Sequence, residues 1–222
     1  MEASALALHR LFDTLLTAYG PRHWWPAPTV PAMMAGAILV QNTAWSGASQ
    51  AVERLLAAGL LDSWPQLLAT PEETLWALIR PAGFFRVKGE RLKALARFLI
   101  DSGGDHDALF RLETPALRAA LLGVHGVGKE TADSILCYAA DRPIFVVDAY
   151  TKRIFSRLGW CDDAVEYDAL QRWVMDRFSG DAQRYGELHA LLVEHAKLHC
   201  RTRPRCDGCP LLFCLRHPRM IP

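Results

Sequence analysis

The apolar residues of the chain recur at helical spacing along almost its whole length. In the first run, residues 6–16, leucines and a phenylalanine fall on one face of a helix that stops at Gly20-Pro21. Similar periodicity predicts further helices at residues 31–40, 47–58, 71–78, 87–99, 115–121, 129–138, 149–158, 167–178 and 182–198. Alternating patterns typical of strands are scarce, and no internal repeat, low-complexity tract or long linker interrupts the sequence. The pattern therefore predicts an all-α fold.

Composition narrows the class of protein. A chain of 222 residues with 51% hydrophobic content can bury a sizeable core, as one domain or as two closely packed lobes. No apolar run approaches the length that spans a membrane, and nothing at the N-terminus reads as a signal peptide. We therefore expect a soluble, cytoplasmic protein without a membrane partner.

The distribution of charge says more than the formal net charge of +1, which is not that of an obvious nucleic-acid-binding protein. Basic residues gather in the middle of the chain and after the first cysteine of the C-terminal loop. They are Arg80, Arg86, Lys88, Arg91, Lys93 and Arg97, followed by Arg201, Arg203, Arg205, Arg216 and Arg219. Each group fits either a solvated helix face or a track for DNA phosphates.

Residues 121–150 combine closely spaced glycines with a carboxylate about twenty residues downstream. Gly126 and Gly128 precede the helix expected at 129–138, where glycines let backbone amides approach a phosphate and the helix dipole favours an anion. Asp148 ends an apolar run. Separately, these features are explained by a tight turn and a helix N-cap. Their combination at this spacing favours a functional site.

Four cysteines stand in one short loop near the C-terminus: Cys200, Cys206, Cys209 and Cys214. The spacing C-x5-C-x2-C-x4-C can supply four thiolates to a [4Fe–4S] cluster or to a zinc ion. A zinc ribbon would more often contain two C-x2-C pairs, and this loop contains one. A disulfide framework fits poorly with an intracellular chain.

These motifs resemble those of the endonuclease III superfamily of DNA glycosylases. Gly126-Val127-Gly128 and Thr131-Ala132 match its helix-hairpin-helix signature, and Val147-Asp148 matches its catalytic aspartate step. The cysteine loop resembles the superfamily's C-terminal cluster loop, although each outer gap is one residue shorter than the usual spacing.

The resemblance implies an all-α, two-lobed helix-hairpin-helix glycosylase fold. A six-helix barrel lobe with the hairpin would comprise residues 28–140, and a [4Fe–4S] cluster lobe would comprise residues 1–27 and 141–222. The groove between the lobes would hold double-stranded DNA that contains a damaged base. The resemblance further implies a monomer, associated with the nucleoid if the source is bacterial.

One position distinguishes two chemistries within the superfamily. In bifunctional enzymes the hairpin reads GVGRKTA, and its lysine attacks the sugar as an amine. Here the same seven positions read GVGKETA, so Glu130 takes the place of that lysine. Lys129 is not expected to replace it, because neighbours on a helix diverge by about 100°. We therefore expect a monofunctional enzyme, without AP lyase activity, in which Asp148 assists water and stabilises the cationic sugar.

Aromatic residues indicate the substrate. Trp24, Trp25 and Pro26 precede the first barrel helix and Trp45 follows it, as in the 3-methyladenine glycosylase branch, where positions matching Trp25, Pro26 and Trp45 line the base pocket. A purine methylated at N3 or N7 is cationic, and tryptophan faces stabilise a cation. Glu130 completes the expected pocket. The simpler alternative is that the two adjacent tryptophans are core residues.

Further residues are expected to handle DNA by their resemblance to the family. Gln41 would enter the hole that a flipped base leaves, and Phe84 would part the opposite strand, whereas Phe85 is expected in the core. The hairpin would bind phosphates through Val124, Gly126, Gly128 and Lys129.

The sequence thus predicts a base excision repair glycosylase that hydrolyses the N-glycosidic bond of alkylated purines. One alternative is the same chemistry on uracil or thymine in a mismatch, or on an oxidised pyrimidine. Another is a non-catalytic protein that binds damaged DNA. A purine-sized gap between Trp25 and Trp45 would favour the first.

Overall fold

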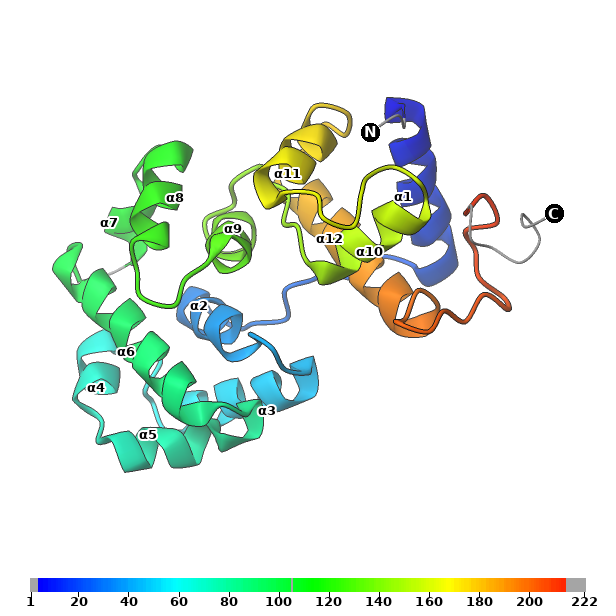
Figure 1. The fold of residues 1–222 in the computed structure, drawn as a ribbon. Helices are drawn as coiled ribbons and strands as arrows, with labels where there is room; N and C mark the ends of the chain where they lie inside the picture. The colour runs from blue at the N-terminus through cyan, green and yellow to red at the C-terminus, as the bar shows by residue number, and fades with distance from the viewer. Residues whose placement is uncertain (1–3, 105, 215–222) are drawn as a thin grey trace. The chain divides into compact units, whose positions relative to one another are not determined.

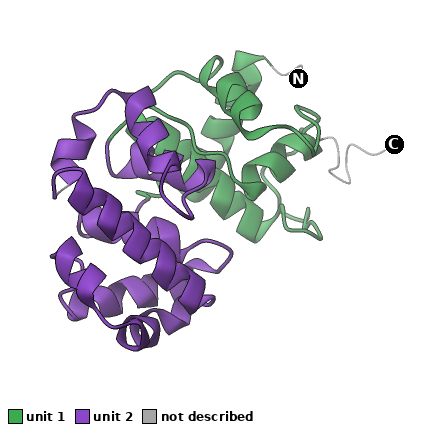
Figure 2. Ribbon diagram, turned by 60° about the vertical axis from the view of Figure 1, so that its left-hand side comes forward, with its two compact units in different colours: residues 1–24, 141–222 green, residues 25–140 purple. Residues whose placement is uncertain are grey.

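A computed structural model of the chain describes residues 4–104 and 106–214. These residues form helices joined by short loops, with no strand among them, so the expected all-α class is confirmed (Figure 1). The chain divides into two compact units, of which unit 1 comprises residues 1–24 and 141–222 and unit 2 comprises residues 25–140 (Figure 2). Within the described part, no helix has both the length and the apolarity that a membrane crossing requires.

Unit 2 is built around helix α2. Its elements are α2 (Val30–Leu39), α3 (Trp45–Ala57), α4 (Trp64–Ala69), α5 (Glu72–Ile79), the short 3-10 helix η1 (Arg80–Ala82), α6 (Phe85–Asp101), α7 (His106–Phe110), α8 (Thr114–Leu122) and α9 (Lys129–Tyr138). Residues 32–39 of α2 are all buried, and the helix contacts α3, α6 and α9. The sequence of α2 is apolar on every side, as a helix enclosed by others requires.

Unit 1 is centred on its last helix. It contains α1 (Ala5–Tyr19), α10 (Ala149–Arg157), α11 (Tyr167–Met175) and α12 (Ala182–Leu198). Both α1 and α10 pack against α12, whose buried face carries His189 and His195 among apolar residues. Asp181 caps the first turn of α12 by accepting a hydrogen bond from the backbone N–H of Arg184. The cysteine loop follows directly after α12.

The predicted helices are found, with differences at short or terminal segments. Periodicity missed α4 and α7, because helices of six and five residues are too short to show a repeat. The helix expected at 167–178 ends at Met175, and Phe178 is buried beyond its end. The helix expected at 87–99 is longer than predicted and begins at Phe85.

Candidate active site

Asp148 is a buried carboxylate at the N-cap of α10. The residue is 8% exposed. Its Oδ1 accepts hydrogen bonds from the backbone N–H of Thr151 at 2.7 Å and from the Thr151 hydroxyl at 2.8 Å. Its Oδ2 lies 3.5 Å from Nε2 of His189, which α12 supplies. The residue expected to be the catalytic carboxylate is therefore also the N-cap of α10.

These contacts fix the charge of Asp148. Burial by itself raises the pKa of the carboxyl group, but the hydrogen bond and charge of His189 and the two hydrogen bonds from Thr151 outweigh burial, so the net pKa lies below the ordinary 3.8. The side chain is accordingly an anion at neutral pH. A buried anion can stabilise a positive charge that develops beside it, and it is a poor proton donor.

His189 was not among the residues selected from the sequence. It is 7% exposed and stands in an otherwise apolar stretch of α12, between Leu188 and Ala190. A polar residue on such a face is the only sequence signal that could have marked it. Its partner is forty-one positions away, so spacing along the chain did not connect the two.

The glycine hairpin lies between α8 and α9, and its two central glycines have different roles. Val124 and Val127 are buried and anchor the hairpin in unit 2. Gly126 has a φ of 82°, and a Cβ built on it would overlap the side chain of Arg91. Gly128 has a φ of −93° and nothing within 4 Å of a built Cβ. Gly126 is thus required by the fold, whereas Gly128 leaves open space beside the backbone.

Lys129 and Glu130 form the exposed first turn of α9. The hydroxyl of Ser134 donates to the backbone carbonyl of Glu130 one turn later, at 2.7 Å. A carboxylate at this position is favourable for the helix because it faces the positive end of the helix dipole.

Gln41 is tied to the hairpin by its side-chain amide. Nε2 donates to the carbonyl of Gly126 at 3.0 Å and to the hydroxyl of Thr131 at 2.9 Å, while Oε1 accepts from the guanidinium of Arg91 at 2.5 Å. In this conformation Gln41 braces the hairpin. Entry of its side chain into DNA would exchange these hydrogen bonds for contacts with bases.

Phe84 projects from a tight turn before α6. Its side chain is 68% exposed, and both Phe84 and the preceding Gly83 have positive φ, at 45° and 64°. Phe85, expected in the core, is only half-buried: its ring packs against Trp76, and the guanidinium of Arg80 lies over it at 4.9 Å. An exposed aromatic ring on a strained turn is unusual, and such features cluster at binding sites.

Trp25, Trp45 and Tyr138 form an aromatic group over α2. The rings of Trp25 and Trp45 meet edge to face with centroids 5.1 Å apart, and Tyr138 lies 5.5 Å from Trp25 on centroids. A Cβ on Gly36 would lie 3.3 Å from the Trp25 indole nitrogen, so the glycine allows this ring to sit close to the helix. The two tryptophans are in contact and leave no purine-sized gap between them. Tyr138 was not selected from the sequence.

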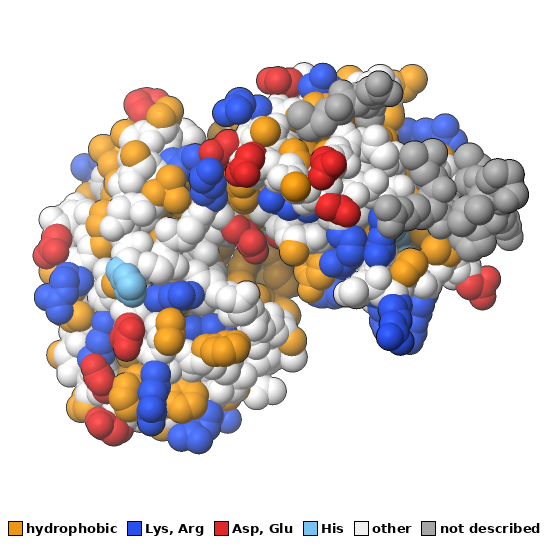
Figure 3. Space-filling model, in the orientation of Figure 1, with side chains coloured by type: hydrophobic (Ala, Val, Ile, Leu, Met, Phe, Trp, Pro, Cys, Tyr) orange, Lys and Arg blue, Asp and Glu red, His pale blue; other side chains and the backbone are white. Residues whose placement is uncertain are grey.

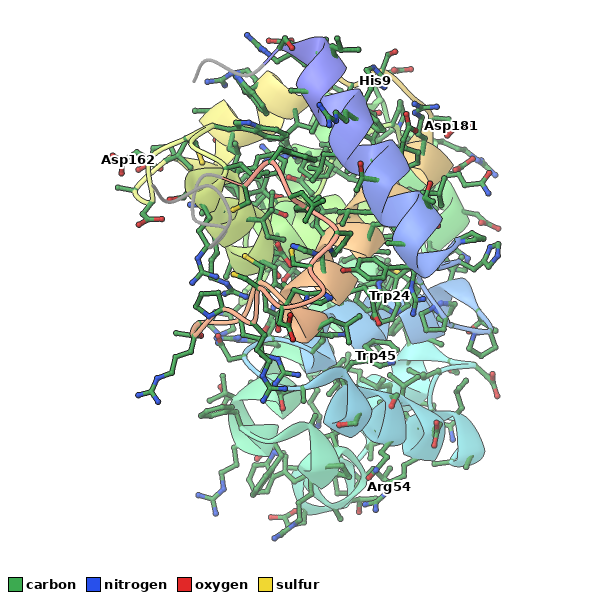
Figure 4. The ribbon with its side chains drawn as sticks, turned by 90° about the vertical axis from the view of Figure 1, so that its right-hand side faces the viewer. His9, Trp24, Trp45, Arg54, Asp162 and Asp181 are labelled. Carbon is green, nitrogen blue, oxygen red and sulfur yellow. The ribbon has the colours of Figure 1, made fainter. Side chains whose placement is uncertain are left out.

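Trp24 and Pro26 were also expected in the base pocket. Trp24 belongs to unit 1, where Nζ of Lys197 lies 5.8 Å from its ring centroid, and Pro26 is exposed (Figure 4 labels Trp24 and Trp45). Lys197 is exposed at the end of α12.

The four loop cysteines line a single cavity of unit 1, together with His195, His199 and residues of α10. No disulfide joins any of the cysteines in the described residues. Burial and the neighbouring thiols raise the pKa of Cys209. Arg157 donates to Sγ of Cys200 at 3.2 Å, and Nε2 of His195 lies 4.0 Å from Sγ of Cys209.

The cavity can be compared with the two candidate metal groups. Among the described residues, no three His, Cys, Asp or Glu side chains are placed to hold a metal ion. A cubane [4Fe–4S] cluster requires a different arrangement from a single metal ion. Each of its four irons is bonded by one thiolate, so the four thiols must surround one cavity without all meeting at a single point. Four thiols that line one cavity, with a guanidinium beside Cys200 to offset negative charge, fit this requirement.

The central basic group is exposed only in part. Lys88 is 1% exposed, whereas Arg80, Arg86 and Arg97 are exposed, with the guanidinium groups of Arg80 and Arg86 over the rings of Phe85 and Trp76. On the face drawn in Figure 3, basic side chains are interspersed with acidic ones on both units. Of the C-terminal basic group, the arginines at 201, 203 and 205 are exposed, whereas those at 216 and 219 lie outside the described residues.

The fold and the site together define the class of protein. The family model of the HhH-GPD superfamily base excision DNA repair protein matches residues 35–178. The chain belongs to this superfamily and is a DNA glycosylase of base excision repair, so the membership expected from the hairpin and Asp148 is confirmed.

Individual relatives are consistent with this membership. The chain is 44% identical over 211 residues to a Methanocaldococcus jannaschii protein named "putative DNA repair glycosylase", which covers 94% of this chain and 96% of that protein. It is 30% identical over 154 residues to endonuclease III of Bacillus subtilis, covering 67% of this chain and 64% of that protein.

Two solved structures are close in fold. The H. pylori 3-methyladenine DNA glycosylase bound to 1,N6-ethenoadenine has a TM-score of 0.74 and 27% identity, covering 88% of this chain and 98% of that chain. A non-covalent endonuclease III–DNA complex has a TM-score of 0.82 and covers 97% of each chain. At 20% identity, the second likeness shows the fold alone.

The two hairpin glycines provide a matched pair of substitutions. Gly126→Ala should lower the free energy of unfolding by about 1–3 kcal/mol, because alanine is strained at positive φ and its Cβ overlaps Arg91. Gly128→Ala should change it by less than about 0.5 kcal/mol, because its backbone is unstrained and the site is open. Urea denaturation measures both.

The same pair separates folding from DNA contact. If amides at Gly128 approach a phosphate, the added methyl group should weaken binding to an undamaged duplex about tenfold, the value of one hydrogen bond to a charged group. Unchanged affinity in Gly128→Ala, measured by fluorescence anisotropy, would exclude a phosphate contact at this position.

Proposed function

We propose that this protein is a monofunctional DNA glycosylase that excises alkylated purines, with Asp148 as the catalytic carboxylate. The observation that carries the proposal is that Asp148 is both buried and held in its ionised form by Thr151 and His189. The reacting sugar acquires positive charge as the glycosidic bond breaks. A fixed anion in a dry environment stabilises that charge more strongly than water does.

The low pKa of Asp148 also restricts its role. The electron pair of the glycosidic bond leaves with the base, and an alkylated, cationic base needs no added proton to depart. Water then bonds to the anomeric carbon and releases a proton to solvent. Asp148 orients this water and stabilises the cation. Because its pKa is low, Asp148 is a weak base, and the reaction does not depend on it to abstract a proton from water.

Support for an alkylated purine comes from two independent features. The aromatic group of Trp25, Trp45 and Tyr138 presents electron-rich faces, which attract a cationic base more than its neutral parent. The structural relative bound to ethenoadenine is a 3-methyladenine glycosylase, and its identity of 27% is higher than that of the endonuclease III–DNA complex.

A second candidate is excision of a neutral pyrimidine, either uracil or thymine in a mismatch or an oxidised base. The edge-to-face contact of Trp25 with Trp45 favours it, because this arrangement leaves less room for a purine. The identity of 30% to endonuclease III of Bacillus subtilis is also compatible with it.

Base release with matched variants tests the proposal. The wild-type protein should release methylpurines from randomly methylated DNA, and Asp148→Asn should reduce the rate about a thousandfold or more, because the amide keeps the helix cap and loses the charge. Asp181→Asn is the control, since it makes the same change at the exposed N-cap of α12. Its rate should equal that of wild type.

Chromatography of the released bases separates the candidates. Release of methylated purines supports the first candidate. Release only from duplexes that contain uracil, mismatched thymine or oxidised pyrimidines supports the second. Excision by Asp148→Asn within a few-fold of wild type would contradict the assignment of the carboxylate, and no release from any lesion would favour the non-catalytic alternative.

The absence of lyase activity is proposed from Glu130, which offers a carboxylate where an amine would be needed. Borohydride should therefore trap no covalent complex between the wild-type protein and DNA with an abasic site. Glu130→Lys tests whether an amine at this position suffices, with Glu130→Gln as the control of equal length. A trapped band in the wild-type protein would show that another lysine, such as Lys129 or Lys197, reaches the sugar.

We also propose that the four loop cysteines hold a [4Fe–4S] cluster. When bound, the cluster would tie the loop to α10 and α12 and present the arginines at 201, 203 and 205 to DNA phosphates. The cysteines supply its ligands, and Arg157 places a positive charge beside Cys200.

The purified protein should be brown and contain about four irons per chain. Cys206→Ser should lose the colour and iron, whereas Cys161→Ser should retain both, because Cys161 stands outside the loop. Visible absorption and iron analysis measure this outcome. A colourless, folded protein with one zinc ion would contradict the cluster.

A further inference from the structure

Lys88 of α6 is a buried cation that serves two backbone carbonyls. Its side chain is 1% exposed, and Nζ donates to the carbonyl oxygens of Leu39 and Ala82, each at 2.7 Å. An ammonium group carries three donors on one centre, so it can join two chain segments at a single point.

The two carbonyls stand at equivalent places in the chain. Leu39 is the last residue of α2, two positions before Gln41, and Ala82 is the last residue of η1, two positions before Phe84. Carbonyls at a helix C-terminus lack partners within the helix, and a cation there is favoured by the dipole of α2. Lys88 therefore joins the segment that leads to Gln41 with the segment that leads to Phe84.

The turn at Phe84 depends on support from outside. Phe84 has a positive φ, which is unfavourable for a residue with a bulky side chain, and its exposed ring gains little from burial. One support is α3, where a Cβ on Gly47 would overlap the carbonyl of Pro81 in η1. The hydrogen bond from Lys88 to Ala82 is a second support, on the α6 side.

Arg91 extends the same face of α6 by one turn. It donates to Gln41, and its aliphatic stem lies against Gly126 of the hairpin. Burial, followed by the charge of Arg91, lowers the pKa of Lys88 to about 8, so the ammonium is still charged at neutral pH but disfavoured there. An apolar side chain would avoid this cost. Lys88 is thus better explained by what it positions than by stability.

We propose that Lys88 is a positioning residue that holds the Gln41 turn and the Phe84 turn in fixed register, so that both enter DNA as one rigid probe. This inference rests on the proposed function, because it assumes that the protein extrudes a base. Without Lys88 the direct link between the two turns would be lost, and a smaller fraction of the molecules would present both residues correctly.

The experiment uses a duplex with a tetrahydrofuran abasic-site analogue opposite 2-aminopurine. The fluorescence of 2-aminopurine rises when it is unstacked, so it reports entry of the probe without knowledge of the natural lesion. Lys88→Met keeps the length of the side chain and removes the donors. It should lose most of the fluorescence gain and bind this duplex about tenfold more weakly, in proportion to the fraction of competent molecules. Affinity for an undamaged duplex should change by less than about twofold.

Lys93→Met is the matched control. Lys93 lies on the same helix and donates at 2.7 Å to the carbonyl of Thr70, at the end of α4, which adjoins neither probing turn. It should behave as wild type. A full fluorescence gain in Lys88→Met would overturn the positioning role, whereas a wild-type protein that binds the duplex without any gain would contradict the proposed function itself.

A mutant cycle tests the rigid probe even if Lys88→Met does not fold. Gln41→Ala, Phe84→Ala and the double variant keep Lys88, and their losses of affinity for the abasic duplex should be strongly non-additive if the two residues act as a unit. Additive losses would overturn the proposal.

Discussion

The anionic side chain of Asp148, removed from water, is the constraint on which the rest of unit 1 depends. A buried charge is costly unless hydrogen bonds and an opposite charge compensate it, and here the compensation comes from the first turn of α10 and from His189 of α12. The position of α10 against α12 is therefore coupled to the charge of one side chain. The same contacts that make this anion tolerable also keep it from taking up a proton, which suits it to stabilise a cation.

Unit 2 differs from unit 1 in that the residues proposed to contact DNA are at least partly exposed. Such residues need support from the structure around them. Phe84 stands on a strained turn, and Gln41 and the glycine hairpin occupy loops at helix ends. Phe84 and Gln41 cannot be fixed by their own burial, whereas the buried Val124 and Val127 anchor the hairpin. Helix α6 supports the turns at Phe84 and Gln41 through Lys88 and Arg91, and the buried helix α2 supports them as well. A rigid core and a few long polar side chains replace the hydrophobic contacts that the turns at Phe84 and Gln41 lack.

This division explains what could be predicted from the sequence. Local sequence patterns could be predicted, because they involve residues close together in the chain. They are the helical periodicity, the glycine hairpin and the role of Asp148 as a helix cap. Other contacts join segments forty or more positions apart, and the spacing of residues along the chain does not predict them. They are the contacts of His189, Tyr138 and Gln41 and the hydrogen bond from Lys88 to Leu39, whereas the hydrogen bond from Lys88 to Ala82 is local. The basic residues around α6 were interpreted by charge alone, whereas burial assigns Lys88 an internal role.

The contact between Trp25 and Trp45 sets a free-energy cost for any base that enters between the two rings. An edge-to-face pair is worth about 0.5–1.5 kcal/mol beyond burial, and a base that entered between the rings would have to replace that contact. A cationic base gains about 0.5–2 kcal/mol from each aromatic face, which matches or exceeds the lost contact. A neutral base gains stacking alone and leaves more of the loss uncompensated. Because separating the rings costs the same free energy for either base, the closed pair lowers both affinities equally, and the preference for a cationic base is set by the cation–π contacts alone.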